Sequence, residues 1–243
     1  MKKITLLLVF MLGVTLPSQS QGWWGTKKVK GNGNVITKKR KISRFNEVSV
    51  GGSFTVMLVE GKVGTLKIEG EENIIPYLET EVKGGDLRIG FKDNMNIRIT
   101  KKLIVTVPFN SLSAVSLGGS GDINVTKEID NNSVAFNIGG SGDIKARVNT
   151  SNVKTSIGGS GTIKLSGKTN NFKCSIGGSG NVRAFDLKTN NLKASIAGSG
   201  DVSVYVTSEI KAAMVGSGNI YYKGKPNNID TTSAGSGDVV DKN

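Results

Sequence analysis

Basic side chains recur at fixed places in this sequence and could together bind an anionic polymer. One set lies four residues before a Gly-Ser-Gly turn, and it comprises Lys154, Lys173, Lys193 and Lys211. A second set follows such turns, and it comprises Lys145, Lys164 and Arg183. Like charges in register repel one another unless water or a polyanion neutralises them. Two interpretations follow: a solvated face that keeps the protein soluble, or a track for an anionic polysaccharide.

Acidic and amide residues recur directly after the same turns and raise the question of a metal. The positions are Asp122, Asp143, Thr162, Asn181, Asp201, Asn219 and Asp238. Calcium arrays in β-helices place aspartates on a nine-residue period. Here the period is about twice as long, and neutral residues interrupt the aspartates. We therefore predict structural, Asx-type hydrogen bonds at the turns and no metal site, with calcium binding as the alternative.

The sequence offers few residues that could catalyse a reaction. The chain has no histidine, which excludes metal–histidine sites and Ser-His-Asp triads. Glycosidases need acidic residues that cluster in space. One acidic group clusters in the sequence, and we expect it to be a solvated loop: Glu69, Glu71, Glu72, Glu79 and Glu81. We predict no catalytic residue, no cofactor and no enzymatic activity, and we expect the single cysteine, Cys174, to be a buried core residue.

Seven x-Gly-Ser-Gly turns, which begin at positions 118, 139, 158, 177, 197, 215 and 234, organise these residues. They hold 18 of the 33 glycines and are spaced 18 to 21 residues apart. The second and fourth positions are always glycine, so we expect both to need a positive φ. These predicted structural positions are Gly119, Gly121, Gly140, Gly142, Gly159, Gly161, Gly178, Gly180, Gly198, Gly200, Gly216, Gly218, Gly235 and Gly237.

The residues around each turn alternate with a period of two. In one repeat Val153, Thr155 and Ile157 precede the turn, and Ile163 and Leu165 follow it, with polar residues between them. Such alternation is typical of strands with one buried face. A repeat of about 19 residues suits one coil of a β-solenoid. The sequence therefore predicts an all-β, right-handed parallel β-helix with an irregular N-terminal β cap.

Four segments make up the predicted organisation. Residues 1–21 have two lysines, a short apolar run and a small-residue exit, as in a secretory signal peptide. Residues 22–30 are expected to be a flexible arm. Residues 31–110 read as irregular β coils of the same domain, and 111–243 as the regular coils with Gly-Ser-Gly turns.

The irregular segment 31–110 contains two predicted turns. Residues 51–53 (Gly-Gly-Ser) resemble a degenerate copy of the repeated turn, and residues 84–86 (Gly-Gly-Asp) resemble a hairpin turn. A single helical turn is expected within residues 71–78.

The net charge of +13 is concentrated near the N-terminus, where residues 27–44 carry eight lysines and arginines and no acid. For an exported protein this favours anionic glycans or membrane surfaces over nucleic acid as partners. Trp23 and Trp24 in the arm could contact lipid headgroups or a partner. No segment after the signal is apolar enough to be an integral membrane span.

The last coil is a candidate contact between two copies of the chain. Ile229, Thr231 and Val239 would expose strand edges and core there. The charged residues Asp230, Asp238, Asp241 and Lys242 could block association instead. We therefore expect either a homodimer through this coil or an edge protected by charge.

Several short motifs together resemble a known family. They are residues 31–37 (GNGNVIT), Phe45-x-x-Val48-x-Val50-x-Gly52, Glu69-Gly70-x-x-Asn73, Gly85-x-Leu87-x-Ile89 and the ladder of Gly-Ser-Gly-Asp/Asn turns. The combination is similar to the "putative auto-transporter adhesin head GIN domain" family over nearly all of the mature chain. The resemblance implies a β-helix adhesin exported by Bacteroidetes-like bacteria. The family defines no catalytic residues, so none are carried over.

Three functions remain open at this stage. The first is an exported, non-enzymatic, adhesin-like protein that binds a glycan or another envelope component. The second is a structural or assembly protein of the envelope without a soluble ligand. The third is a polysaccharide lyase or hydrolase. The expected location is the periplasm, the outer-membrane surface or the exterior.

Overall fold

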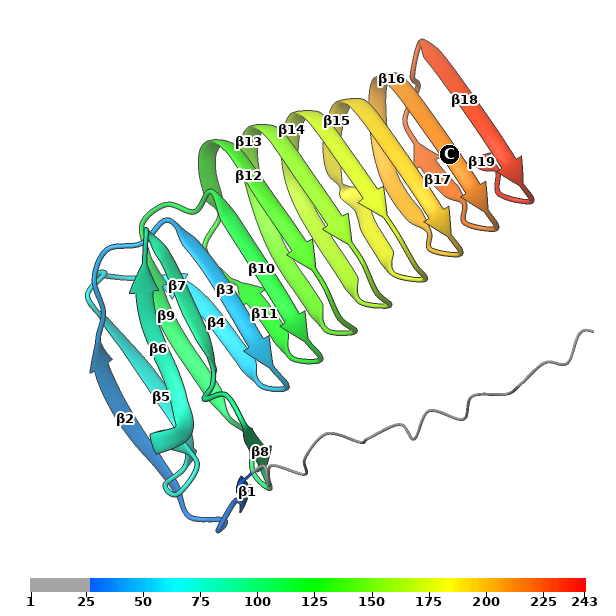
Figure 1. The fold of residues 1–243 in the computed structure, drawn as a ribbon. Coiled ribbons are helices and arrows are strands. Elements are labelled where there is room, and N and C mark those ends of the chain that lie inside the picture. Colours follow the sequence, from blue (N-terminus) through cyan, green and yellow to red (C-terminus); the bar gives the residue numbers. More distant parts are fainter. Residues whose placement is uncertain (1–26) are drawn as a thin grey trace, which may run out of the picture.

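Stacked strands form an elongated β-solenoid in the computed structural model, which describes residues 27–243 (Figure 1). The predicted signal peptide at 1–21, together with Trp23 and Trp24, lies outside the described residues. Strands β2–β7 and β9–β19 belong to one 17-stranded sheet that winds along the rod, and β1 and β8 form a separate two-stranded sheet. No helix in residues 27–243 is long and apolar enough to cross a membrane.

The regular coils begin with the first Gly-Ser-Gly turn and continue to the C-terminus. Their strands are β10 (Ala114–Gly119), β11 (Asp122–Val125), β12 (Ile129–Ile138), β13 (Asp143–Ile157), β14 (Thr162–Ile176), β15 (Asn181–Gly198), β16 (Val202–Gly216), β17 (Ile220–Lys223), β18 (Asn228–Gly235) and β19 (Val239–Asp241). All pairings among them are parallel. In Figure 1 the strands nearest the viewer run down to the turns, and the chain then goes back up behind them as successive coils advance toward the C-terminus. The solenoid is therefore right-handed.

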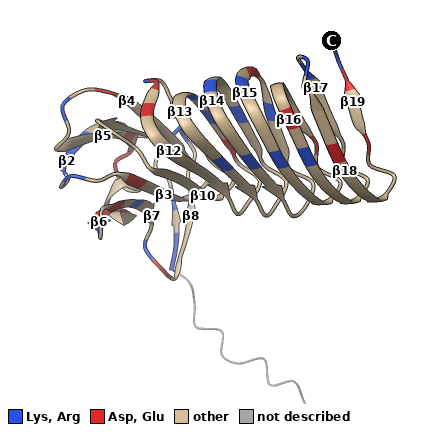
Figure 2. Ribbon diagram, turned by 90° about the horizontal axis from the view of Figure 1, so that it is seen from above, with Lys and Arg blue, Asp and Glu red and all other residues tan. Residues whose placement is uncertain are grey.

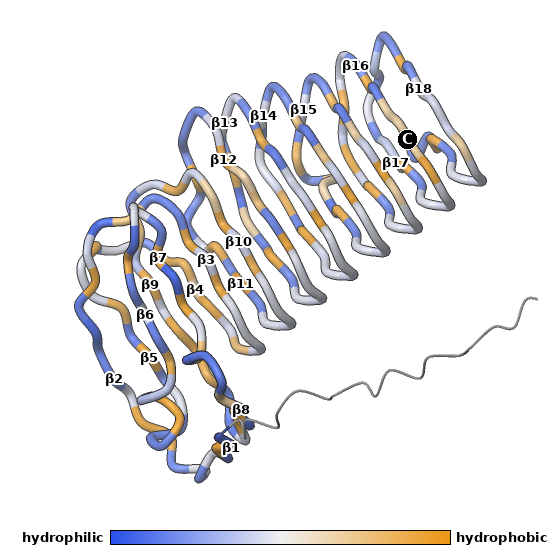
Figure 3. Tube along the Cα trace, in the orientation of Figure 1, coloured by the Kyte–Doolittle hydropathy of each residue, from blue (hydrophilic) through white to orange (hydrophobic). Residues whose placement is uncertain are grey.

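The core is a set of stacked rows inside the coils. Val153, Ile157, Ile163 and Leu165 are all at most 2 % exposed, as the alternation predicts. Figure 3 shows the same alternation as apolar and polar bands along each strand. Cys174 is fully buried in one of these rows, and this burial raises the pKa of its thiol to about 12. The expected core role of this cysteine is confirmed, and its thiol stays protonated and unreactive.

The turn glycines are required for a different reason from the one predicted. None of the fourth-position glycines has a positive φ, so that expectation was wrong for them. A Cβ built at Gly161 would instead overlap the carbonyl oxygen of Gly142 in the coil below and lie 2.9 Å from Cγ2 of Ile138. The same overlap with the preceding turn recurs at Gly142, Gly200, Gly218 and Gly237.

The second position combines close approach with special backbone geometry. Gly119, Gly198, Gly216 and Gly235 have φ between +117° and +154°, whereas Gly140, Gly159 and Gly178 have no positive φ, so the expectation was wrong for these three. At each of them a Cβ would also meet the backbone of the preceding turn. Glycine is thus required at both positions mainly because successive turns lie backbone to backbone.

The N-terminal cap is more irregular than the coils. Its elements are β2 (Val35–Lys41), β3 (Glu47–Gly52), β4 (Thr55–Glu60), β5 (Thr65–Glu71), the 3-10 helix η1 (Ile75–Tyr77), β6 (Leu78–Lys83), β7 (Asp86–Phe91), β8 (Met95–Arg98) and β9 (Ile104–Phe109). The helical turn expected within 71–78 is confirmed as η1. The hairpin turn is also confirmed: β6 and β7 are antiparallel, with Gly84 and Gly85 at φ 59° and 85°.

The coils of the cap do not stack in the order of the sequence. β3 pairs with β10 and places Gly51 and Gly52 in register with Gly118 and Gly119, so 51–53 is the degenerate turn that was predicted. On its other side β3 pairs with β7, and β4 lies between β11 and β9 in the same way. The chain therefore builds the first coil, moves outward to form the cap with β5–β9, and returns to continue the rod.

Part of the expected flexible arm is ordered as a strand. Strand β1 (Lys27–Lys30) pairs in parallel with β8. The Lys27 ammonium also lies 5.5 Å from the centre of the Tyr77 ring. The prediction of a flexible arm was therefore wrong for residues 27–30, because β8 offers an unpaired strand edge beside them.

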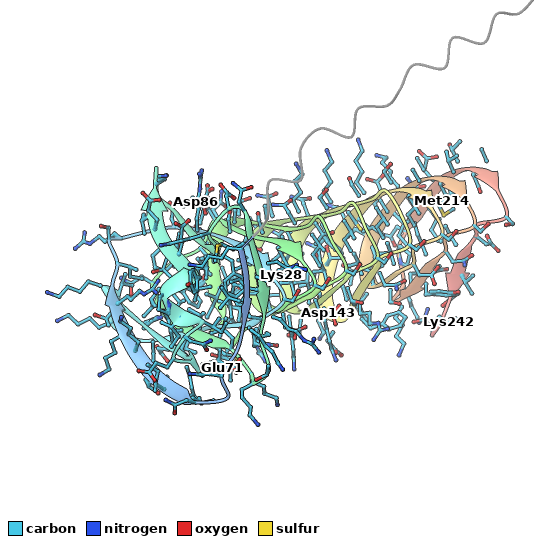
Figure 4. The ribbon with its side chains drawn as sticks, turned by 60° about the horizontal axis from the view of Figure 1, so that its bottom comes forward. Lys28, Glu71, Asp86, Asp143, Met214 and Lys242 are labelled. Atoms are coloured by element: carbon cyan, nitrogen blue, oxygen red, sulfur yellow. The ribbon has the colours of Figure 1, made fainter. Side chains whose placement is uncertain are left out.

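A buried carboxylate ties the cap together. Glu71, at the end of β5, is 1 % exposed, so the expected solvated loop was wrong for this residue. It accepts hydrogen bonds from the Gly33 N–H at 2.7 Å, from the Thr100 N–H at 2.7 Å and hydroxyl at 2.6 Å, and from the Lys101 N–H at 3.3 Å. Burial alone would raise the pKa of Glu71, but these hydrogen bonds outweigh it and lower the pKa to about 2. Figure 4 places Glu71 within the cap, away from the regular coils.

The other acidic residues of the sequence cluster lie on two strands. Glu69 is on β5, Glu72 directly follows it, and Glu79 and Glu81 are on β6. Glu72, Glu79 and Glu81 are exposed. The cluster is thus dispersed over the cap rather than gathered in a loop.

The last coil is open on one side within the described residues. All eight residues of β18 are exposed, and β18 pairs along one edge, with β16. Ile229 is 42 % exposed there. The homodimer through this coil stays a prediction.

We predict that Gly161→Ala destabilises the rod, whereas Gly158→Ala in the same turn does not. The first substitution forces a Cβ into the backbone of the turn below and should cost about 2 to 3 kcal/mol. The second meets nothing nearer than the Ile138 oxygen at 3.9 Å and should leave stability unchanged or raise it slightly. Thermal unfolding measures both. Equal melting temperatures for the two variants would contradict the close-stacking explanation.

We predict that the stability supplied by Glu71 is lost as the pH falls from about 4.5 to about 2. The unfolded carboxylate protonates near pH 4.5 and the folded one near pH 2, so the contribution is complete above this window. Glu71→Gln should lower the free energy of unfolding at pH 7 by about 2 to 3 kcal/mol and flatten the acid dependence. The exposed Glu79→Gln is the matched control. If both variants unfold like the wild type from pH 7 to 2, the carboxylate does not hold the cap.

Candidate functional site

The four lysines that precede the turns form one continuous row along the rod. Lys154, Lys173, Lys193 and Lys211 are direct neighbours in the parallel register of β13, β14, β15 and β16. All four side chains are exposed, and Figure 2 shows basic segments that repeat on neighbouring coils. Parallel strands are about 4.8 Å apart, so this lysine row presents one positive charge per coil.

A row of asparagines runs beside the lysine row, two residues earlier on each strand. Asn171 donates a side-chain hydrogen bond to the Oδ1 of Asn152 at 3.1 Å, and Asn191 donates to the Oδ1 of Asn171 at 3.2 Å. Each amide therefore supports the next across the coils. We call Asn152, Asn171 and Asn191 the amide row.

The lysine row and the amide row line a shallow groove of about 530 Å³ that runs along the rod. The groove extends from Ser133 on β12 to Glu209 and Lys211 on β16. Its floor includes the backbone of Val153, Phe172 and Leu192, whose side chains are buried in the core. The groove is therefore long, open and lined by groups that donate hydrogen bonds.

At its C-terminal end the groove is bordered by an ion pair. Glu209 takes the place of an asparagine in the amide row and pairs with Lys211 at 2.9 Å. Hydrogen bonds from Lys211 and then Asn228 lower the pKa of Glu209, and the bond to Glu209 raises the pKa of Lys211. In the described chain, Lys154, Lys173 and Lys193 make no such ion pair.

The second basic row lies on a different wall of the solenoid. Lys145, Lys164 and Arg183 are in register on the strands that follow the turns. They line a smaller hollow of about 230 Å³ together with Asp122 and Asp143. The turns separate the two rows, so the predicted basic residues form two sites rather than one. The two carboxylates border this second row, but no ion pair within residues 27–243 joins them to it.

The residues after the turns form a hydrogen-bond ladder between coils. The Thr162 N–H donates to Asp143 at 2.9 Å, the Asp201 N–H to Asn181 at 3.1 Å and the Asn219 N–H to Asp201 at 2.8 Å. We expected bonds within each turn, but most of them join one coil to the next. One side-chain oxygen serves this purpose equally well in Asp and Asn, which explains their interchange.

No group of three or more Asp, Glu or Cys residues in the part of the chain that the structure describes is placed to hold a metal ion. Figure 4 shows Asp143 on the rod, far from Glu71 in the cap. The calcium alternative therefore gains no support from a ligand cluster within residues 27–243.

Two features of the grooves were not recognised from the sequence. The first is the amide row, although each of its asparagines stands two residues before a lysine. The second is a polar hollow of about 660 Å³ beside the residues that precede the amide row, where Lys168 and Lys188 are in register near Asn170 and Asn190. The recurrence of Asn-x-Lys at the coil period was the available signal for the first.

The comparisons with known proteins point to one group. The family described as "Putative auto-transporter adhesin, head GIN domain" matches residues 44–226. A solved structure titled as a putative adhesin of Bacteroides fragilis has a TM-score of 0.83 and 25% identity, covering 88% of this chain and 100% of that one. One titled as a putative lipid binding protein of Parabacteroides distasonis has a TM-score of 0.75 and 29% identity, covering 89% and 100%. A putative adhesin of Parabacteroides merdae has a TM-score of 0.68 and 26% identity, again covering 89% and 100%. No curated protein matches the chain.

We predict that the turn ladder tolerates Asp201→Asn but not Asp201→Ala. Asparagine keeps an oxygen that accepts the Asn219 N–H, whereas alanine leaves that donor unpaired at a cost of about 1 kcal/mol. Calcium should leave the melting temperature of the wild type unchanged. A calcium-dependent rise that Asp201→Asn abolishes would show instead that the aspartates hold a metal.

Proposed function

This chain belongs to the putative auto-transporter adhesin head GIN domain family, and on that premise we propose that it is a non-enzymatic, adhesin-like protein that binds an anionic polysaccharide. The site we assign is the groove formed by the lysine row and the amide row. The protein would act outside the cytoplasm, because residues 1–21 have the pattern of a secretory signal.

The observation that carries this proposal is the unbroken alignment of basic side chains along an open groove. Lys154, Lys173 and Lys193 repeat at the coil spacing and make no ion pair within residues 27–243. Three neighbouring positive charges without counter-charges are electrostatically unfavourable. A linear polyanion would relieve this repulsion at every coil at once.

The amide row adds groups suited to a sugar. Within the row Asn152 uses only its Oδ1, Asn191 only one N–H, and Asn171 one of each, so every amide keeps at least one N–H that can meet a ligand hydroxyl. The groove thus offers charge for acid groups and hydrogen bonds for hydroxyls over the same length. Such a shallow, open site suits a polymer better than a small molecule.

The groove lacks the features of a hydrolase or lyase. Its one lining carboxylate, Glu209, is held by Lys211 and Asn228. Glycosidases need two carboxyl groups that flank the scissile bond. This supports binding rather than cleavage, and it favours the adhesin-like function over the enzymatic alternative.

We predict that the purified protein is retained on alginate or heparin resin at low salt and elutes as salt rises. Replacing Lys154, Lys173 and Lys193 together by glutamine should weaken binding by at least about tenfold, since each lysine beside an anionic surface contributes about 1 kcal/mol. The matched control replaces Lys145, Lys164 and Arg183, which removes the same charge from the other wall.

The control variant should retain most of the binding. Equal losses in the two triple variants would mean that only net charge matters. No retention of the wild type on any anionic glycan at low salt would contradict the proposal and favour an envelope protein without a soluble ligand.

A further inference from the structure

We propose that the groove is specific for a uronic-acid polymer with a carboxylate on every sugar, and that it engages three consecutive sugars. This inference rests on the proposed function and narrows it to a ligand class and a length. Three observations support it: the spacing of the lysines, the residues in register with the row at each of its ends, and Glu209, which stands where the amide row would have another asparagine.

The spacing of the row sets the acid spacing of the ligand. The lysines occur once per coil, about 4.8 Å apart, and one pyranose unit of an extended 1,4-linked chain advances by a similar distance. A chain with an acid on every sugar offers one carboxylate per coil, and the long, flexible lysine side chains can reach the acids that the rotation between successive sugars turns to either side. A chain with an acid on every second sugar would leave alternate lysines unpaired. The lysine row therefore favours the first kind of polymer.

The two ends of the row limit its length. On the N-terminal side the position in register with Lys154 is Ala135, which carries no charge. On the C-terminal side Lys211 is bound to Glu209, and the next position in register is Asp230. Lys154, Lys173 and Lys193 are thus the three neighbouring lysines that remain for the ligand.

Glu209 marks the boundary for both rows. It stands in register with Asn191 on one side and Asn228 on the other, so it interrupts a line of amides. Its carboxylate accepts hydrogen bonds from Lys211 and from the Asn228 side chain at 3.1 Å. One residue therefore removes a lysine from the track and places a negative charge where a fourth carboxylate would lie. Substitution of Glu209 by an amide should extend the site by one sugar.

The test is calorimetric titration of the purified protein with galacturonate oligomers of one to six sugars. Affinity should increase up to three sugars and then change by less than about twofold. Glu209→Gln should move the plateau to four sugars and strengthen binding of the tetramer by at least fivefold. Asp230→Asn removes the same charge one coil further on, without freeing Lys211, and should leave the plateau at three.

Oligomers of hyaluronan, which carry an acid on every second sugar, test the charge spacing. They should bind at least tenfold more weakly than galacturonate oligomers of equal length. Equal affinity for the two series, steady strengthening up to six sugars, or an unchanged plateau in Glu209→Gln would overturn this inference while leaving polyanion binding intact. Failure of every anionic oligomer and polymer to bind would overturn the proposed function as well.

Discussion

The structure depends on how closely the backbone of one turn lies on the backbone of the turn below. At these positions there is no room for a Cβ, so a glycine pair recurs in every regular coil. The turns therefore cannot slip relative to one another, and the strands on both sides keep one register for several coils. This fixed register turns lysines scattered through the sequence into a straight row. A glycine content that would suggest flexibility in another protein here specifies a rigid rod.

The cap covers the N-terminal end of the rod. A parallel coil leaves strand edges and apolar rows open, and here antiparallel strands from β2, β5 and β6 cover them. The buried carboxylate of Glu71 accepts hydrogen bonds from N–H groups of two separate loops. The cap thus adds charge-assisted hydrogen bonds to the strand pairing and the buried apolar core that it shares with the regular coils.

Much of the fold could be predicted because the repeated part has a strict period. The alternation around each turn identified the buried rows, including Cys174, and the register of the lysines follows directly from the repeat. The fourth-position glycines show the limit of such reasoning, since a sequence does not reveal whether glycine is needed for φ or for a close approach. Glu71 and β1 were misread because their partners are remote in sequence: Thr100 for Glu71 and Met95–Arg98 for β1. The amide row was missed because asparagine is common in turns, so a single one suggests no partner in another coil.

The central claim is that the aligned lysine and amide rows act as one binding surface, and its most direct measurement is a ¹H–¹⁵N spectrum of the side-chain amides during titration with polygalacturonate. Our account predicts that the resonances of Asn152, Asn171 and Asn191 shift together at the same ligand concentration, while that of Asn124 on the other wall stays in place. Shifts confined to Asn124 and its neighbours, or none at all in the amide row at saturating ligand, would contradict it.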